Sequence, residues 1–258
     1  LRFFTRSLLQ IRKMKNKTEI KTEENTTEST KENRKEKKAE DKLENKLENK
    51  ESTKQKKTIL IATDCFMPRI DGIARFLEML IPYLSKHRVI VVAPGFKGSL
   101  KKDNNYELHK VKLRNIQIGD YIPAKKPGPD IIKLIDQADL IFSQTIGPVG
   151  ATIVKEAYKR KKKVVSFVHS IEWVLVEKSL SKSNLIRSVM GFLTLLRARN
   201  VYSKCDGIIV PSNNVAEIFS ARGIKNSKYI IHLGIDPDKF KPSDKAKAKA
   251  EIGLDKDD

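Results

Sequence analysis

The sequence has few cysteines and lacks both the long apolar runs and the glycine-rich motifs that would assign it at once. Its 258 residues include two cysteines, Cys65 and Cys205, and neither has a partner at the spacing of a metal-binding motif. Two cysteines cannot build a disulfide framework, so this usage is typical of a reducing cytosol. We expect Cys65 to be a small buried residue.

No uncharged apolar run of about 18 residues occurs, so no transmembrane helix is expected. Neither Gly-x-Gly-x-x-Gly nor a P-loop is present, so the dinucleotide fingerprint and the P-loop NTPase signature are missing.

Charge of one sign is abundant: 52 Lys and Arg stand against 32 Asp and Glu, for a formal net charge of +20. Such an excess attracts nucleic acid or an anionic membrane. Much of it lies in the N-terminal region and in short clusters such as Lys159–Lys163, however, and a solvated basic surface explains it equally well. We do not expect a nucleic-acid partner.

Residues 1–57 are predicted to be a tail. The segment Leu1–Lys15 mixes apolar and basic residues and resembles an interfacial helix or a transit peptide, but we expect it to be an incidental tail. From Lys15 to Lys57 the chain is mostly Lys, Glu, Asn and Thr, which cannot bury enough apolar surface to offset chain entropy. We therefore expect disorder there.

From Thr58 onwards, short apolar runs alternate with amphipathic stretches. The apolar runs predict strands at Thr58–Thr63, Arg88–Ala93, Tyr106–Leu113, Ala138–Ser143, Lys163–Val168, Asp206–Val210 and Lys228–Ile231. The amphipathic stretches predict helices at Ile73–Lys86, Pro129–Gln137, Gly147–Arg160, Asn184–Lys204 and Asn213–Arg222. This alternation predicts an α/β, Rossmann-like, doubly wound sheet that is mostly parallel.

The long helix Asn184–Lys204 combines many apolar residues with three arginines. A basic amphipathic helix can lie on a membrane surface. More often such a stripe packs against its own sheet, and we expect that here.

The loop between the first strand and its helix is the first candidate site, because ligands of such sheets bind at the carboxyl ends of the strands. It reads Asp64-Cys-Phe-Met-Pro-Arg-Ile-Asp-Gly-Ile-Ala74. Gly72 precedes the helix, where a missing Cβ lets a ligand approach the backbone and the helix N-terminus favours an anion such as phosphate. The structural alternative is an ordinary turn in which Gly72 relieves strain.

The second candidate is the segment from Phe167 to Trp173. His169 falls at a strand end and could hydrogen-bond a sugar hydroxyl or a phosphate. Glu172 could accept from hydroxyls, and Trp173 could offer an apolar face to a sugar ring. The structural alternative is a histidine bonded to a neighbouring loop, with Trp173 in the core.

Taken in order, these segments resemble the family-4 glycosyltransferases, which are retaining enzymes with the GT-B architecture. The chain has Phe66-x-Pro-x-x-x-Gly72, with Asp71 where the family usually has a second glycine. It also has His169 at the end of a middle strand, Asp206-Gly-Ile-Ile-Val-Pro-Ser212, and Leu233-Gly-Ile-Asp…Phe-x-Pro242, in which Leu233 replaces an asparagine. The resemblance covers Thr58 to Pro242.

The resemblance implies a domain organisation. Residues 58–242 would be the N-terminal, acceptor-side Rossmann-like domain of a GT-B fold, and residues 243–258 would begin the linker. The C-terminal domain, which in this family binds the sugar nucleotide, is then expected beyond the printed sequence. This portion alone would be inactive.

The implied activity is transfer of a hexose from a nucleotide-diphosphate sugar to a lipid or glycan acceptor, without metal or other cofactor. His169 would be catalytic, near the transferred sugar, and the substrate-binding residues would be Pro68, Asp71, Gly72, Ser170 and Glu172. We expect a cytoplasmic protein, with the inner face of an anionic membrane as an alternative place of action. Two other functions stay open: a non-catalytic module that binds anionic lipid or nucleic acid, and a GT-B sugar-nucleotide epimerase.

Overall fold

The computed structural model describes residues 56–98, 105–117, 122–179 and 183–234, with a few isolated positions from 242 onwards. The predicted disordered tail, apart from residues 56 and 57, lies outside the described residues. So do residues 235–241 of the Leu233–Pro242 segment and most of the expected linker.

All strands of the sheet are parallel, and their order is β3-β2-β1-β4-β5-β6-β7. They are β1 (Thr58–Ala62), β2 (Arg88–Pro94), β3 (Glu107–Val111), β4 (Leu140–Ser143), β5 (Val164–Phe167), β6 (Gly207–Val210) and β7 (Lys228–Ile230). The chain runs outward from β1 to β3 and then returns to the other side of β1. This reversal between β1 and β4 defines a doubly wound, Rossmann-like α/β fold, as predicted.

The sheet is buried on both faces, which is why its central strands are apolar without alternation. Leu60 and Ile61 are neighbours in β1 and both have no exposed surface. Leu60 packs into the cluster on one face, and Ile61 packs into the cluster on the other. The continuous apolar run predicted a strand buried on both faces, and the structure confirms this prediction.

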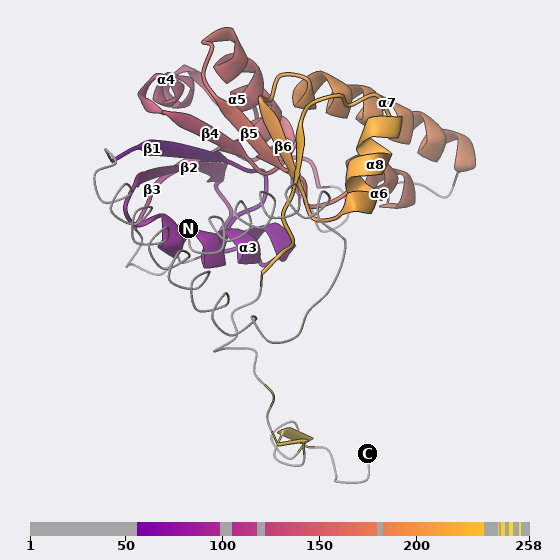
Figure 1. The fold of residues 1–258 in the computed structure, drawn as a ribbon, viewed down its shortest axis with the longest axis horizontal. Helices are drawn as coiled ribbons and strands as arrows, with labels where there is room; N and C mark the ends of the chain where they lie inside the picture. The colour runs from indigo at the N-terminus through magenta and orange to yellow at the C-terminus, as the bar shows by residue number, and fades with distance from the viewer. Residues whose placement is uncertain are drawn as a thin grey trace, which may run out of the picture.

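The helices of the described residues are divided unequally between the two faces (Figure 1). On one face lie α3 (Gly72–Leu80) and the 3-10 helix η1 (Ile81–Leu84), which bury Leu77 and Ile81. The other face carries α4 (Pro129–Gln137), α5 (Pro148–Lys159), α6 (Glu172–Ser179), α7 (Asn184–Tyr202) and α8 (Asn213–Ala221). Helix α8 is followed by Gly223, whose φ of +78° suits glycine, so the predicted helix end is confirmed.

Two details differ from the sequence prediction. The first predicted helix is divided, because its α-helical part ends at Leu80 and a 3-10 turn containing Pro82 follows. Proline lacks the N–H that an α-helix would need there. The structure also has a helix that was not predicted, α6. It is short and has no strong apolar periodicity, so the sequence carried little signal for it.

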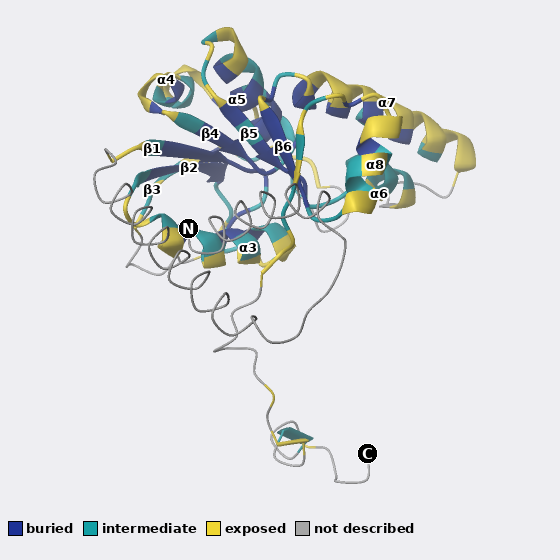
Figure 2. Cartoon of the chain, viewed as in Figure 1, coloured by how far each residue is buried: buried dark blue, intermediate teal, exposed yellow. Residues whose placement is uncertain are grey.

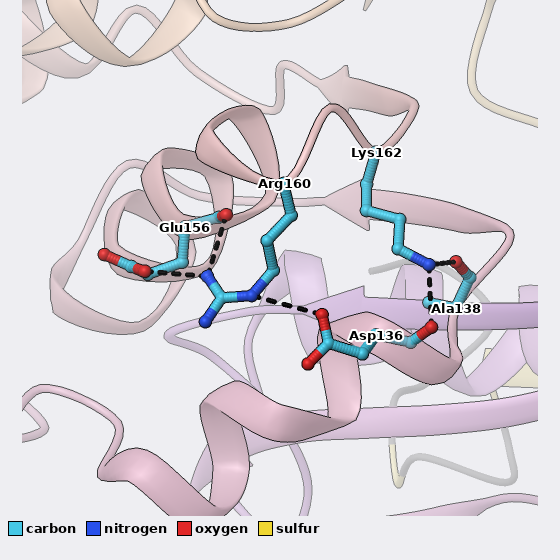
Figure 3. A network of polar contacts seen from close by, with 5 residues as sticks. All are labelled: Asp136, Ala138, Glu156, Arg160 and Lys162. Carbon is cyan, nitrogen blue, oxygen red and sulfur yellow. Dashed lines mark hydrogen bonds and ion pairs between the residues drawn. The ribbon is translucent and has the colours of Figure 1, made fainter.

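Two residues of the basic cluster Lys159–Lys163, Arg160 and Lys162, contribute to the fold where α5 ends and the chain leads into β5 (Figure 3). The Arg160 guanidinium pairs with Glu156 at 2.8 Å and with Asp136 at 3.2 Å. Lys162 Nζ donates to the carbonyls of Asp136 and Ala138 at 2.7 and 3.0 Å. Because these carbonyls end α4, the two side chains join the C-terminus of α4 to the segment leading into β5.

Helix α7 contradicts the expectation that its apolar stripe packs against the sheet. Its buried side consists of Gly191, Leu195, Ala198, Val201 and Tyr202. The larger apolar side chains on its outer side are exposed (Figure 2): Leu185, Ile186, Val189, Met190, Phe192, Leu193 and Leu196. Among the described residues, no helix is long and apolar enough to cross a bilayer.

A single carboxylate, which we call the Asp64 lock, joins the loop after β1 to the loop after β4 and the start of α5, where the strand order reverses. Asp64, which follows β1, accepts from the Thr145 hydroxyl at 2.5 Å and from the N–H groups of Val149 and Gly150 at 2.8 and 3.1 Å. Asp64 therefore caps α5 from another strand, where a negative charge is favoured. Glycine is required for this contact, since a Cβ on Gly147 would lie 2.4 Å from the Asp64 carboxyl carbon.

We predict that Gly150→Ala destabilises the protein by about 3 kcal/mol, because the new Cβ would lie 1.9 Å from the Thr145 carbonyl oxygen and the backbone must shift. Urea unfolding measures the change. Gly128→Ala is the control, because a Cβ at that helix-capping position meets nothing within 4 Å. Equal stability of the two variants would contradict the prediction.

Candidate functional site

The carboxyl ends of β1, β4 and β5 bring three loops to one edge of the sheet. These are residues 63–71, 144–147 and 168–171, and the first lies about 80 residues before the second and about 100 before the third. The Asp64 lock joins the first two loops. In doubly wound sheets this edge, at the reversal of strand order, is where ligands bind.

His169 lies at this edge, as predicted. Its Nε2 is 2.9 Å from Oε1 of Gln144, which follows β4. Its ring packs against Phe76 of α3 and Phe167 of β5, with centroid separations of 5.0 and 4.6 Å. These contacts fix both the position and the orientation of the imidazole.

The charge state of His169 follows from this environment. Burial lowers the pKa of His169 to about 4, although the nearby Asp71 carboxylate opposes the shift. The imidazole is therefore neutral at pH 7. With Gln144 Oε1 as the acceptor, Nε2 carries the proton and Nδ1 keeps a lone pair that can accept from a hydroxyl.

The loop after β1 is organised by Asp71. Its side chain accepts from the Ala74 N–H at 2.9 Å and so caps α3. It also lies near Cys65, and burial together with the Asp71 charge raises the pKa of the Cys65 thiol. Cys65 is half-buried, not fully buried as expected, and it is consequently a protonated thiol and a poor nucleophile.

Gly72 is the first residue of α3 and is exposed. A Cβ placed there would meet nothing within 4 Å, so packing within the protein does not require glycine. The open space lies at the N-terminus of α3, where backbone N–H groups and the helix dipole favour an anion. The backbone at Gly72 is therefore open to a ligand, while the Asp71 carboxylate, with Arg69 Nε 3.6 Å away, already caps this helix end.

Pro68 and Ser170 lie in the same loops and are both half-buried. Pro68 packs closely on the chain after β2, because a Cβ on Gly98 would lie 2.7 Å from Pro68 Cγ. Ser170 directly follows His169. Their predicted contacts with substrate stay predictions.

Glu172 and Trp173 are turned into the helical layer. Glu172 Oε1 accepts a hydrogen bond from the Tyr202 hydroxyl of α7. Trp173 is 4% exposed and packs against Phe219 of α8, so the idea that it offers a face to a sugar ring is wrong. The structure therefore brings Asp71, Gly72 and His169 to one edge but directs the Glu172 carboxylate elsewhere, and its role as a substrate ligand stays a prediction.

Burial governs the ionisation of Glu172. The residue keeps some exposed surface, but its Oε2 is buried without a hydrogen-bond partner among the described residues. This desolvation raises the pKa of Glu172 to about 7, against a smaller opposite effect of the Tyr202 hydroxyl.

Sequence reasoning missed two residues that organise this edge, Gln144 and Asp64. Both are buried polar residues, with 2% and 3% of their surface exposed. The available signal was their position, since each follows an apolar strand within two residues. Within the described ranges, no group of three His, Cys, Asp or Glu side chains is placed to hold a metal ion.

Comparison with known proteins gives a family match. The family model described as Glycosyltransferase Family 4 matches residues 70–239. A search of curated proteins found no significant match.

Solved structures give only weak likenesses. Sucrose-phosphate synthase from Thermosynechococcus elongatus is 12% identical with a TM-score of 0.49, over 78% of this chain and 53% of that one. A UGT transferase from Siraitia grosvenorii, solved with UDP, is 10% identical with a TM-score of 0.42, over 76% and 55%. A UDP-glucose:anthocyanidin 3-O-glucosyltransferase, also solved with UDP, is 10% identical with a TM-score of 0.43, over 78% and 58%. The chain thus spans just over half the length of each.

The raised pKa of Glu172 predicts a pH-dependent stability. The folded state holds the proton up to about pH 7 and the unfolded chain releases it near 4.5, so this contribution is complete below pH 4.5 and is lost as pH rises through 7. Glu172→Gln cannot ionise, and should exceed the wild type in stability by up to about 3 kcal/mol at pH 8 but not at pH 4.5. Urea unfolding at both pH values measures this. The exposed Glu217→Gln serves as control, and a Glu172→Gln effect independent of pH would refute the assignment.

Proposed function

Because this chain belongs to Glycosyltransferase Family 4, we propose that it forms the acceptor-side half of a retaining hexosyltransferase. The intact enzyme would transfer a hexose from a nucleotide-diphosphate sugar to a lipid or glycan acceptor. A second domain would bind the nucleotide and complete the site against the edge that carries Gly72 and His169. The observation that carries the proposal is the match of the family over residues 70–239, which includes both residues.

The geometry of the edge formed by the carboxyl ends of the strands supports separate roles for Gly72 and His169. The open backbone at Gly72, at the N-terminus of α3, would let a diphosphate approach, and Arg69 beside Asp71 would offset the charge of the capping carboxylate. His169 lies across the same edge and presents a neutral imidazole, which can bind a sugar hydroxyl without bringing a positive charge. The two features would bind adjacent parts of one sugar nucleotide.

In the proposed reaction, the bond between the anomeric carbon and the diphosphate oxygen breaks, and the acceptor oxygen bonds to the same face of that carbon. The acceptor proton passes to the departing diphosphate. The chain would contribute by positioning and by stabilising charge, so His169 is proposed to hold the sugar and not to act as a general base. The two free cysteines are in keeping with work in the cytoplasm.

The direct test is a transfer assay on a preparation that includes the proposed second domain. A panel of labelled nucleotide sugars is offered with lipid and glycan acceptors, and NMR reports the anomeric configuration of the product. Label transferred with retention supports the proposal. Failure of every donor with every acceptor, or an epimerised sugar nucleotide as the product, would exclude it.

We predict that His169→Asn lowers kcat by about 100-fold, because a positioned contact to the transferring sugar is lost. The fall in rate should persist across pH 6 to 8, since His169 does not titrate in that range. His109→Asn is the matched control, as this histidine lies in β3, away from the edge. A similar loss in both variants would point to general instability.

We also predict that Gly72→Ala leaves the free energy of unfolding within about 1 kcal/mol of the wild type, because the new Cβ meets no protein atom. It should raise KM for the nucleotide sugar about tenfold, since the methyl group would occupy the approach to the helix N-terminus. Gly128→Ala, equally open and at the N-cap of α4, should leave KM unchanged. An unaltered KM in Gly72→Ala would remove the phosphate contact from the proposal.

A further inference from the structure

The outer side of α7 is apolar where a surface helix should be polar. Seven large apolar side chains between Leu185 and Leu196 are exposed, from 36% for Met190 to 76% for Leu185. We call these residues, 185, 186, 189, 190, 192, 193 and 196, the α7 ridge. Contiguous exposed apolar patches of this kind mark interaction surfaces.

A basic groove continues the ridge. It lies between α5 and the C-terminal end of α7, has a volume of about 660 Å³ and is lined by six cationic residues: Arg114, Lys126, Lys155, Lys159, Arg197 and Lys204. Glu156 is the only acidic residue among the described residues of its lining, and it is paired with Lys159 and Arg160. Burial and the surrounding like charges lower the pKa of Lys155.

Ridge and groove occupy one side of the same helix. Ile186, Met190 and Leu193 lie on the ridge, and Arg197, Asn200 and Lys204 line the groove. Successive members of this series are three or four residues apart, so they form a single stripe along α7, continued by Lys204 just after its end, that is apolar first and polar and basic afterwards. The two features therefore form one continuous surface.

We propose that this surface docks the protein on an anionic lipid bilayer, with the α7 ridge at the level of the upper acyl chains and the basic groove against phosphate headgroups. The combination of an apolar helical face with adjacent Lys and Arg is what an interfacial helix requires. Helix α7 would lie along the membrane, because no described helix can cross it.

Charge decides between a bilayer and a second copy of the chain. A second copy could cover the ridge, but it would bring another basic groove to the contact, and the formal net charge of each chain is +20. An anionic bilayer covers the apolar residues and neutralises the groove at the same time. Electrostatic complementarity therefore favours lipid.

The surface adjoins the candidate site. Arg197 Nε donates to the Ile146 carbonyl at 2.7 Å, in the loop that follows β4 and precedes Gly147. Docking would thus hold the protein close to the bilayer through the same helix that contacts this loop. The inference goes beyond the proposed transferase activity and does not depend on it.

The test is flotation of the full 258-residue chain with phosphatidylcholine vesicles, with and without phosphatidylglycerol, and without any sugar nucleotide. The wild type should bind the anionic vesicles and bind phosphatidylcholine at least tenfold more weakly. Leu193→Glu, on the ridge, should lower the affinity for anionic vesicles about tenfold or more. Lys126→Gln with Lys155→Gln should lower it by about fivefold for each lysine.

Two matched variants serve as controls for side-chain type: Tyr83→Glu, an exposed apolar residue of η1, and Lys86→Gln, which follows η1. Both should bind as the wild type does. The tail is present in every variant, so any vesicle binding of its own is constant. Thermal unfolding verifies that each variant is folded.

Equal binding by Leu193→Glu and Tyr83→Glu would overturn the proposal, as would a wild type that ignores lipid charge. Size-exclusion chromatography with light scattering adds a further outcome. A wild-type dimer that Leu193→Glu converts to a monomer, without vesicle binding, would assign the ridge to self-association. A preparation that transfers sugar but does not bind vesicles would leave the proposed function standing alone.

Discussion

The arrangement of the candidate site depends on one buried carboxylate. Asp64 leaves β1 and satisfies N–H groups of the first turn of α5, at the point where the strand order reverses. Removing it would leave buried donors unpaired and would separate the loops that follow β1 and β4. Its surroundings leave no room for larger residues, since Gly147 and Gly150 are both packed against this contact.

The Asp64 hydrogen bonds hold the loops after β1 and β4 together. A second contact, between Gln144 and His169, joins the loop after β4 to the loop after β5. Gln144 follows β4 and holds His169, so the imidazole is placed by a residue from a different loop. The N-terminus of α3 lies at the same edge, and Asp71, in the loop after β1, caps it. Such hydrogen-bonded positions would serve the transfer proposed above, because that reaction would require the sugar and the diphosphate to be held in a fixed relation.

Helix α7 serves two different environments. The middle of its inner side is made of small and medium residues and packs on α6, where a Cβ on Gly191 would lie 3.4 Å from the Trp173 carbonyl oxygen. Near the end of α7, Tyr202 donates to the Glu172 carboxylate of α6. Its outer side keeps the large apolar residues. The prediction that the apolar stripe of α7 packs inward was therefore wrong. The stripe is apolar, but the residues that pack inward are Gly191, Leu195 and Ala198.

By itself, the sequence determined the alternation of strands and helices, the fold class, the position of His169 after a strand and that of Gly72 at the start of a helix, because periodicity and turn residues are local properties. The short helix α6 lacked periodicity and escaped prediction. Only the tertiary structure decided that Asp64 caps a helix about 85 residues away, that Gln144 orients His169, that Trp173 is buried and that the α7 ridge is exposed. Each of these depends on which distant segments meet, and the burial that neutralises His169 and shifts the pKa of Glu172 exists only after they have met.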